Sequence, residues 1–283
     1  MNNLAHVNCG ICGASESEPI HQIRGFQIVR CVRCGCIYTN PRHVWDYSRS
    51  GITLPGKLSM YQQYYWPKRK ASADRFWKGA ENFRQTGSLL EVGCGFGFFL
   101  NEARLHGWSV TGVEIAQDEA AWGRDHFELS IVSVLDDMQL HEQQFDVVVL
   151  WDVIEHIPDV IPVLKRCYKL IRPGGVLVLK TPNADGLRMQ PAWWSWVYLQ
   201  FYWQLIYPAN PLEHVYHFTP SLLSKTLQEH NFNVLKIDTE QSWQERIVVG
   251  RNLLVKLTRF LLMWIAWRLH LPYEMIVWAE KPL

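Results

Sequence analysis

The 283-residue sequence lacks a strong excess of charge of either sign. Lys and Arg number 28 against 27 Asp and Glu, giving a net charge of +1, and charged residues make up only 19%. A chain this close to neutral has no global attraction for nucleic acid or for an acidic membrane surface. Residues 1–75 nevertheless hold ten basic and four acidic residues, a balance of +6, and the remainder carries −5. This asymmetry suggests two parts with different roles, the N-terminal part being the expected neighbour of an anionic ligand.

Long apolar runs are also scarce. Polar residues interrupt the positions after Met1, so no secretory signal is predicted and we expect a cytoplasmic protein. In the apolar segment Leu253–Leu271, three basic residues leave a longest clean run of eight, whereas about 20 residues are needed to span a bilayer. Gly and Pro total 32 of 283, and 48% of the residues are hydrophobic. These values exclude a collagen-like or disordered chain and indicate one large or two unequal folded domains.

Four of the seven cysteines form two C-x-x-C pairs. Cys9 and Cys12 make the first pair, Cys31 and Cys34 the second, and eighteen residues lie between the pairs. This spacing is typical of a four-thiolate zinc site, and Cys36 is an alternative to Cys34 as the fourth ligand. The segment has few apolar residues, so we expect structural zinc to take the place of a core. A redox dithiol is the less favoured interpretation, because no strand and helix pattern flanks either pair.

The sequence divides into three predicted parts. Residues 1–45 form a zinc-ribbon-like segment, residues 46–84 a linker and a helix, and residues 85–283 the second domain. Residues 42–56 are rich in Pro, Gly and Ser, as linkers are, and aromatic residues recur at helical spacing from about 60 to 83. An aromatic insertion is predicted at about 186–215. Its candidate roles are a lid over an acceptor, packing on the body or a second subunit, and attachment to a membrane surface.

A glycine loop lies near the start of the second domain. The apolar run Leu89–Val92 precedes the stretch GCGFG at 93–97, and a segment of helical character follows. The next predicted strand, Ser109–Val113, ends in Glu114, 21 positions after Gly93. That is the distance expected of a ribose-binding acid in a nucleotide-binding β-α-β unit. Because Phe98 stands where a dinucleotide loop has a third small residue, a nicotinamide cofactor is disfavoured and adenosine is the implied ligand.

Four ordered motifs resemble those of class I S-adenosylmethionine-dependent methyltransferases. They are EVGCGFG at 91–97, VTGVE at 110–114, FDVVVLWDVIEH at 145–156 and RPGGVLVLK at 172–180. The resemblance covers residues 88–182 and implies an α/β fold, a doubly wound Rossmann-like methyltransferase sheet preceded by the small zinc-binding segment. Continuous apolar runs at 147–150 and 176–179 agree with it, because parallel strands are buried on both faces. Ligands of such sheets bind beyond the carboxyl ends of the strands.

The resemblance also implies the residues that bind S-adenosylmethionine. The loop binds the amino-acid end of the cofactor, with Glu91 at its ammonium, and Glu114 binds the ribose. Val134 stands where the family often has an acid for the adenine amine, so Asp136 is assigned to that contact. The structural alternative for Asp152 is to cap the next helix, at 153–157. The expected cofactor-binding residues are Glu91, Gly93, Cys94, Gly95, Gly97, Glu114, Asp136 and Asp152, with Cys94 as a small rather than a reactive residue.

Three histidines are candidates for a catalytic base. Transfer to a hydroxyl or to an acidic carbon requires loss of a proton, and a positioned base then contributes about 10²- to 10⁴-fold. His156 follows the fourth strand on the family's substrate side. His214 and His217 precede a predicted helix capped by Thr219, with Pro220 in its first turn. The structural alternative for His156 is to orient the turn that carries it. For His214 and His217 the alternative is packing of their loop.

The acceptor is open at this level. A zinc segment joined to a methyltransferase domain also resembles enzymes of polysaccharide and secondary-metabolite pathways, which favours a small molecule such as a sugar nucleotide. The aromatic stretch better suits a quinone-like or lipid acceptor at a membrane surface. An RNA methyltransferase that docks through the zinc segment is disfavoured by the small net charge and the short basic runs. A non-catalytic cofactor-binding protein is the third class, and the oligomeric state is open.

Overall fold

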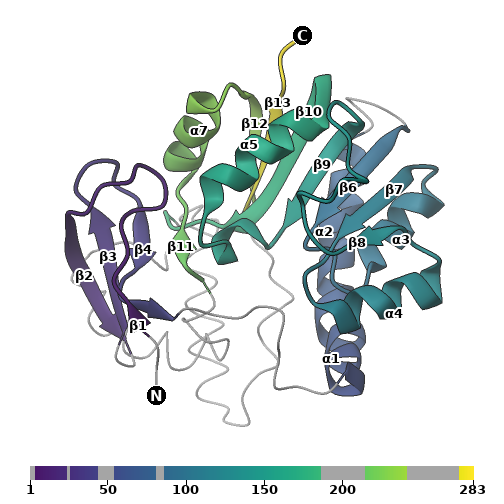
Figure 1. The fold of residues 1–283 in the computed structure, drawn as a ribbon, viewed down its shortest axis with the longest axis horizontal. Helices are drawn as coiled ribbons and strands as arrows, with labels where there is room; N and C mark the ends of the chain where they lie inside the picture. Colours follow the sequence, from purple (N-terminus) through teal and green to yellow (C-terminus); the bar gives the residue numbers. More distant parts are fainter. Residues whose placement is uncertain (1–3, 24–25, 44–53, 81–85, 186–213, 241–273) are drawn as a thin grey trace.

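The computed structural model describes residues 4–23, 26–43, 54–80, 86–185, 214–240 and 274–283. It contains a seven-stranded sheet covered by helices on both faces, with a smaller sheet of the N-terminal segment beside it (Figure 1). Residues 186–213 of the aromatic insertion predicted at about 186–215, and the apolar segment 253–271, lie outside the described residues. Within the described part, no helix is long and apolar enough to cross a membrane.

The large sheet has the strand order β12-β13-β10-β9-β6-β7-β8. Its strands are β6 (Ser88–Val92), β7 (Ser109–Val113), β8 (Ile131–Val132), β9 (Phe145–Trp151), β10 (Ile171–Pro182), β12 (Asn233–Glu240) and β13 (Glu274–Glu280). The five strands from β8 to β10 pair in parallel, and β13 runs antiparallel to both of its neighbours. The strand order reverses between β6 and β9, so the ligand crevice of such a sheet is expected beyond the carboxyl ends of these two strands.

The centre of this sheet is buried on both faces. All seven residues of β9 are buried, which explains why its sequence is a continuous apolar run rather than an alternating one. The helices that cover the two faces include α3 (Phe98–Leu105), α4 (Gln117–Phe127), α5 (Val160–Leu170) and α7 (Pro220–Glu229). One core cluster includes residues of α5 and α7, and the other includes residues of α3 and α4. The predicted doubly wound α/β sheet is confirmed.

The start of α7 follows the predicted pattern. Thr219 precedes the helix, and its hydroxyl oxygen accepts a hydrogen bond from the Leu222 N–H at 3.1 Å. Pro220 occupies the first turn, where its missing N–H has no helical partner to lose. The cap fixes the point at which the preceding loop, which carries His214 and His217, enters the helix.

The helical region before the glycine loop begins earlier than expected and is built from three pieces. They are α1 (Leu54–Met60), a π-helical turn η1 (Tyr61–Tyr65) and α2 (Trp66–Ala80). Pro55 and Gly56, which the sequence assigns to a linker, lie in the first turn of α1, where Pro is tolerated. The wide turn η1 lies directly before the Trp66-Pro67 pair that opens α2, and such turns are frequent at functional sites.

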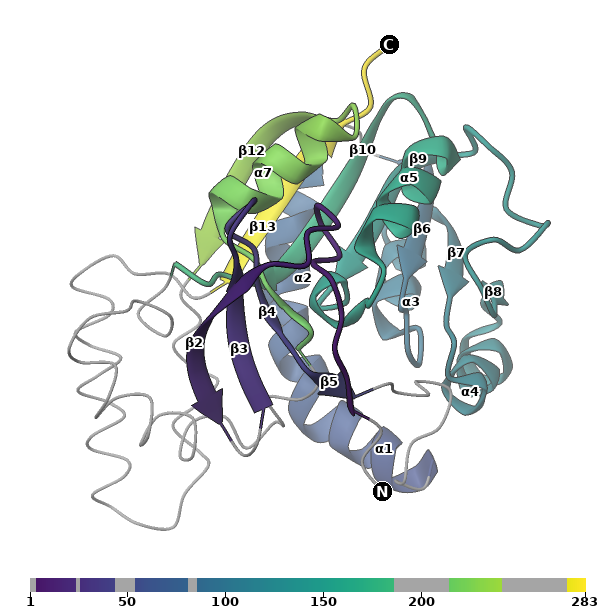
Figure 2. The same ribbon diagram turned by 60° about the vertical axis from the view of Figure 1, so that its left-hand side comes forward.

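The N-terminal segment is joined to the large domain by a shared sheet. Its strands are β1 (Leu4–Ala5), β2 (Ser17–Ile23), β3 (Phe26–Cys31), β4 (Ile37–Thr39) and β5 (Arg42–His43). The small sheet has the order β11-β4-β3-β2, and its edge strand β11 (Tyr216–His217) comes from the chain just before α7. Figure 2 shows the green ribbon of β11 beside the purple β4.

Burial also stabilises this segment, which corrects the expectation that zinc alone would serve as its core. Cys31, Cys36 and Tyr38 belong to the same buried cluster as residues of the large sheet. The hydroxyl of Tyr216 donates to the carbonyl oxygen of Pro158 at 2.8 Å and ties β11 to the large domain. The sequence did not reveal this packing because β11, which pairs with β4 on the side opposite β3, lies more than 170 positions further along the chain.

Candidate active site

The glycine loop joins β6 to α3 at the switch point of the sheet. Gly93, Gly95 and Gly97 have φ values of 74°, 54° and 77°, a backbone region that favours glycine. A Cβ atom on Gly93 would lie 2.6 Å from the Cγ2 atom of Val153. A Cβ atom on Gly95 would meet only the Glu119 carboxylate, at 3.4 Å, so this side of the loop leaves room for a ligand to approach the backbone.

Glu114 is held at the end of β7 by two backbone donors. Its Oε2 accepts from the Gly95 N–H at 2.7 Å, and its Oε1 accepts from the Ala116 N–H at 2.8 Å. The residue is buried, with 8% of its surface exposed. Each carboxylate oxygen has a further lone pair for a ligand hydroxyl. Glu114 therefore orders the glycine loop and presents a fixed pair of acceptors beside it.

Glu91 is a fully buried carboxyl group at the end of β6. Neither carboxylate oxygen has a hydrogen-bond partner among the described residues. Burial raises the pKa of Glu91 to about 8, with the nearby Arg69 charge opposing the rise and Glu114 adding to it. A buried carboxyl group without donors is destabilising unless a ligand supplies them. The group that this position fits is a cation with N–H donors, such as a ligand ammonium.

This pKa predicts that ligand binding releases a proton. At pH 7 a group of pKa about 8 is about 90% protonated, and an ammonium ligand favours its ionised form. Binding of S-adenosylmethionine at pH 7 should therefore release about 0.9 proton per site, and its association constant should rise from pH 6 to pH 7.5. Calorimetry in two buffers of different ionisation enthalpy measures this number. The Glu91→Gln variant should release none, and equal release by both proteins would contradict the assignment.

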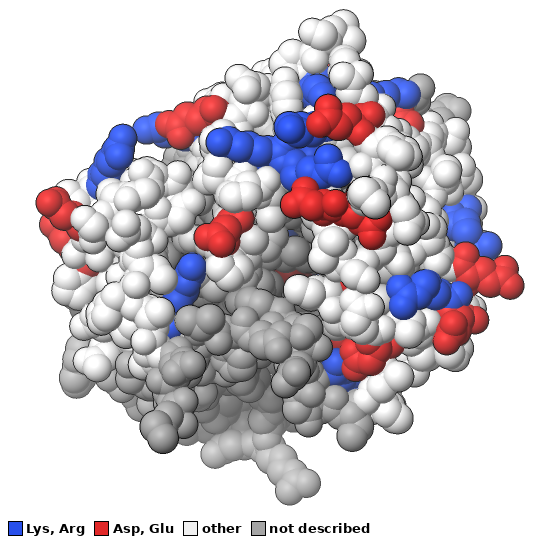
Figure 3. All heavy atoms as spheres, viewed as in Figure 1, with Lys and Arg blue, Asp and Glu red and all other residues white. Residues whose placement is uncertain are grey.

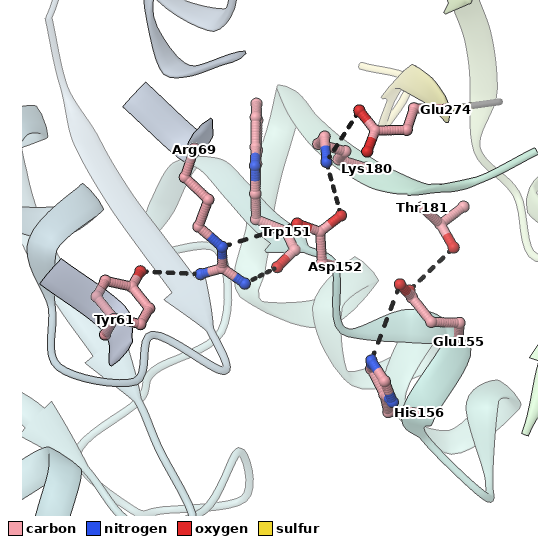
Figure 4. A network of polar contacts seen from close by, with 9 residues as sticks. All are labelled: Tyr61, Arg69, Trp151, Asp152, Glu155, His156, Lys180, Thr181 and Glu274. Carbon is pink, nitrogen blue, oxygen red and sulfur yellow. Dashed lines mark hydrogen bonds and ion pairs between the residues drawn. The ribbon is translucent and has the colours of Figure 1, made fainter. Parts of the chain in front are cut away.

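Asp152 belongs to an ion-pair network rather than to a helix cap. Figure 4 shows its carboxylate between Lys180, at 2.8 Å, and Arg69, at 3.7 Å. Burial would raise the pKa of Asp152, but the two cations hold it below its usual value. Arg69 also donates to the hydroxyl of Tyr61 and to the carbonyl of Trp151, both at 3.1 Å. The turn η2 (Ile154–His156) has no side-chain cap, so the capping role considered for Asp152 is wrong.

Sequence reasoning missed Tyr61, Arg69 and Lys180. Arg69 lies in the short basic run at 68–70, and Lys180 closes the fourth motif, so both were visible as charges without a role. Lys180 is nearly buried, and its second partner, Glu274 at 3.4 Å, comes from β13. Their joint position depends on α2, β9, β10 and β13 packing together, which no local pattern encodes.

Two residues assigned to the cofactor lie differently from the others. The side chain of Cys94 is buried beside Gly112, and burial raises its thiol pKa, in agreement with a packing role. Asp136 is exposed and forms an ion pair with Arg166 of α5 at 3.1 Å. Its carboxylate thus faces α5, and its contact with adenine stays a prediction.

A second polar cluster lies beyond the ends of β9 and β10. Glu155 is buried, and its Oε2 accepts from the Thr181 hydroxyl at 2.9 Å. The Nε2 atom of His156 lies 4.0 Å from its Oε1 (Figure 4). The ring of His214 meets that of His156 edge to face, with centroids 4.7 Å apart. Because Val153, two residues before Glu155, touches Gly93, this cluster lies next to the glycine loop.

The structure thus brings together two of the three predicted histidines. His156 comes from η2 and His214 from the loop before β11. His217 lies in β11, opposite Ile37 of the small sheet. Burial lowers its pKa to about 4, so it is neutral at physiological pH. A neutral histidine accepts a proton only weakly at such a pKa, which makes His217 the weakest base of the three.

The four predicted zinc ligands converge. The Sγ atoms of Cys9, Cys12, Cys31 and Cys34 all lie within 4.8 Å of one another. The Cys9–Cys34 and Cys12–Cys31 sulfur distances are both 3.5 Å, close to the edge of about 3.8 Å of a tetrahedron with 2.3 Å zinc–sulfur bonds. Cys36 lies outside this set. Its thiol lowers the pKa of Cys34 to about 4 and that of Cys9 to about 6, so both favour the thiolate form.

A family profile described as a methyltransferase domain matches residues 64–237, more than half of the chain. The chain belongs to this methyltransferase family. The methyltransferase domain thus includes α2, which packs Phe76 and Trp77 against the sheet. The glycine loop, Glu114 and the donorless Glu91 all fit S-adenosylmethionine, the cofactor that the family implies.

Relatives and solved structures agree with this membership. The methyltransferase is 36% identical over 105 residues to a ubiquinone biosynthesis O-methyltransferase of Pseudomonas paraeruginosa and 30% identical over 105 residues to that of Hydrogenovibrio crunogenus. These matches cover 35% of this chain and 45% and 44% of the relatives, less than half of their length. A methyltransferase structure from Archaeoglobus fulgidus has a TM-score of 0.53 at 21% identity, covering 75% of this chain and 94% of that one. A methyltransferase structure from Mesorhizobium loti has a TM-score of 0.51 at 18% identity, covering 72% of this chain and 97% of that one. Both structures show the shared fold.

Proposed function

We propose that this protein transfers a methyl group from S-adenosylmethionine to a hydroxyl group of a small, ring-shaped acceptor of the quinol or phenol kind. The relatives named above are O-methyltransferases of ubiquinone biosynthesis, which supports a quinol over the sugar nucleotide favoured by the sequence. The observation that carries the proposal is the cluster of Glu155, His156 and His214 next to the glycine loop. A hydroxyl acceptor needs such proton-accepting groups, whereas an amine acceptor needs them less.

The protein's own groups have separate roles in this proposal. S-adenosylmethionine supplies the electrophilic methyl group when it is bound. Glu91 holds the ammonium, the backbone of Gly93–Gly97 approaches the amino-acid end, and Glu114 accepts hydrogen bonds from the ribose hydroxyls. Asp152 is kept ionised between Arg69 and Lys180, so it offers an acceptor of fixed direction at the crevice. Alignment of the two reactants contributes up to about 7 to 11 kcal/mol in reactions of this kind.

His156 and Glu155 are the proposed route for the acceptor proton. The carboxylate lies 4.0 Å from Nε2 and is itself held by Thr181. Burial raises the pKa of Glu155, and a positive charge on His156 opposes that rise.

An RNA acceptor is less well supported. On the face shown in Figure 3, Lys and Arg side chains lie interspersed with Asp and Glu, so its described residues form no continuous basic surface. Binding of RNA through its phosphates requires such a surface. The net charge of +1 points the same way.

The test is a methylation assay with labelled S-adenosylmethionine and three acceptor classes. A catechol-type quinol, a sugar nucleotide and total RNA are incubated separately with the zinc-loaded full chain. We expect label in the quinol, and a fall of at least about 100-fold in its turnover in His156→Ala, the lower end of the range for a lost base. His141→Ala, at an exposed histidine that is not part of the cluster, is the matched control. Label in RNA or in the sugar nucleotide alone would overturn the proposed acceptor.

A further inference from the structure

Glu155, His156 and His214 form a second set of metal-ligand side chains outside the cysteine tetrad. One ligand atom from each lies within 4.8 Å of the other two. Glu155 offers an oxygen and the two histidines offer ring nitrogens. One carboxylate with two imidazoles is a donor set used for Zn²⁺ and for other first-row divalent cations.

The backbone holds the two parts of this set together. The Val215 N–H donates to the carbonyl oxygen of Glu155 at 2.8 Å, which fixes the His214 loop against η2. From the other side, the Thr39 hydroxyl of β4 donates to the carbonyl oxygen of His214 at 3.2 Å. The three side chains thus come from backbone segments that are already joined, so little ordering is needed to bind an ion.

Burial gives the set a reason to bind a cation. Glu155 is 2% exposed, and its Oε1 faces the Nε2 of His156 at 4.0 Å, which is longer than a hydrogen bond. Its Oε2 is already oriented by the Thr181 hydroxyl, an outer partner of the kind that ligating carboxylates have. His156 and His214 are half-buried.

We propose that Glu155, His156 and His214 bind one divalent cation of the zinc class, leaving open positions for an oxygen of the acceptor. The binding of the ion does not depend on the proposed function, but its catalytic role rests on it. A cation at this place lowers the pKa of a bound hydroxyl, which then releases its proton to water. The resulting oxyanion forms the bond to the methyl carbon while the carbon–sulfur bond breaks and its electron pair stays on sulfur. Without the ion, His156 accepts the acceptor proton as proposed above; with the ion bound, His156 and His214 are ligands and the proton goes to water.

The test compares the zinc content of variants. The full chain is equilibrated with excess Zn²⁺, passed through a desalting column, and analysed for metal per chain. We expect the unaltered protein to hold one zinc more than His214→Ala and His156→Ala, and His141→Ala to hold the same amount as the unaltered protein. Binding of S-adenosylmethionine within threefold of the original affinity shows that each variant is folded.

Equal zinc in the unaltered protein and both histidine variants would overturn the cation site. Glu155→Gln, which keeps the size of the side chain, gives a second reading and should also lose one zinc. The two proposals fail separately. If the variants lose one zinc but the protein methylates no quinol, the cation site is supported and the proposed acceptor is excluded. If the protein methylates a quinol but holds no extra zinc, the acceptor is supported and the cation site is excluded.

Discussion

Glu114→Ala is expected to weaken the binding of S-adenosylmethionine by at least about 100-fold. Charge-assisted hydrogen bonds of a carboxylate contribute about 1.5–3 kcal/mol each, and two of them to ribose hydroxyls reach that effect. The same substitution releases the Gly95 and Ala116 N–H groups, which the carboxylate now holds at 2.7 and 2.8 Å. The loss thus includes disorder of the glycine loop as well as the missing contacts. Isothermal titration calorimetry with the cofactor measures it.

Two further variants separate these causes. Glu114→Gln keeps one acceptor oxygen but places an NH₂ group against a backbone donor, so we expect an intermediate loss. Glu102→Gln removes a carboxylate on the surface of α3 whose exposed ion pair with Lys70 contributes at most about 1 kcal/mol. Cofactor affinity in this control should stay within twofold. An unchanged affinity in Glu114→Ala would exclude Glu114 from the cofactor site.

Removal of the cysteine tetrad is expected to impair turnover much more than cofactor binding. We expect the tetrad to bind zinc and Cys12→Ser to lose it, and structural zinc contributes about 10–16 kcal/mol in small sites. Loss of the zinc is expected to loosen β4. In the small sheet, β4 lies between β3 and the edge strand β11. The hydroxyl and the backbone N–H of Thr39 donate hydrogen bonds to the carbonyl oxygens of His214 and Val215, respectively. Movement of β4 should therefore displace His214. We expect turnover to fall at least tenfold while cofactor affinity changes less than threefold.

A milder variant tests the same link without removing metal. Thr39→Val deletes the hydroxyl that donates to His214 and should cost about 1 kcal/mol, a fall in turnover of about fivefold. Val32→Ala changes an exposed position between Cys31 and Cys34 and serves as the control. The rate of amide hydrogen exchange at β11 should increase in Cys12→Ser and in Thr39→Val but not in Val32→Ala. If Cys12→Ser loses cofactor binding together with the metal, the role of the tetrad is not confined to the acceptor side.

Much of the cofactor side of the site could be predicted from sequence. The glycine loop, the acid that follows β7 and the cysteine pairs are short patterns in which neighbouring residues determine the backbone, and the structure places each of them as a group. Asp136 was harder to place, because the loop after β8 has no such pattern and its charge faces Arg166 of α5. The acceptor side was predicted as three separate histidines, and their grouping with Glu155 was not.

The sequence by itself determined the methyltransferase fold and the four-cysteine cluster, because strand periodicity, glycine spacing and ligand spacing are local properties of the chain. Only the tertiary structure decided that β11 completes the sheet of the cysteine segment and that Arg69 and Lys180 converge on Asp152. Those contacts join residues from 28 to more than 170 positions apart. They form because separate apolar faces must pack together, and the polar groups at their borders are then paired by position rather than by sequence.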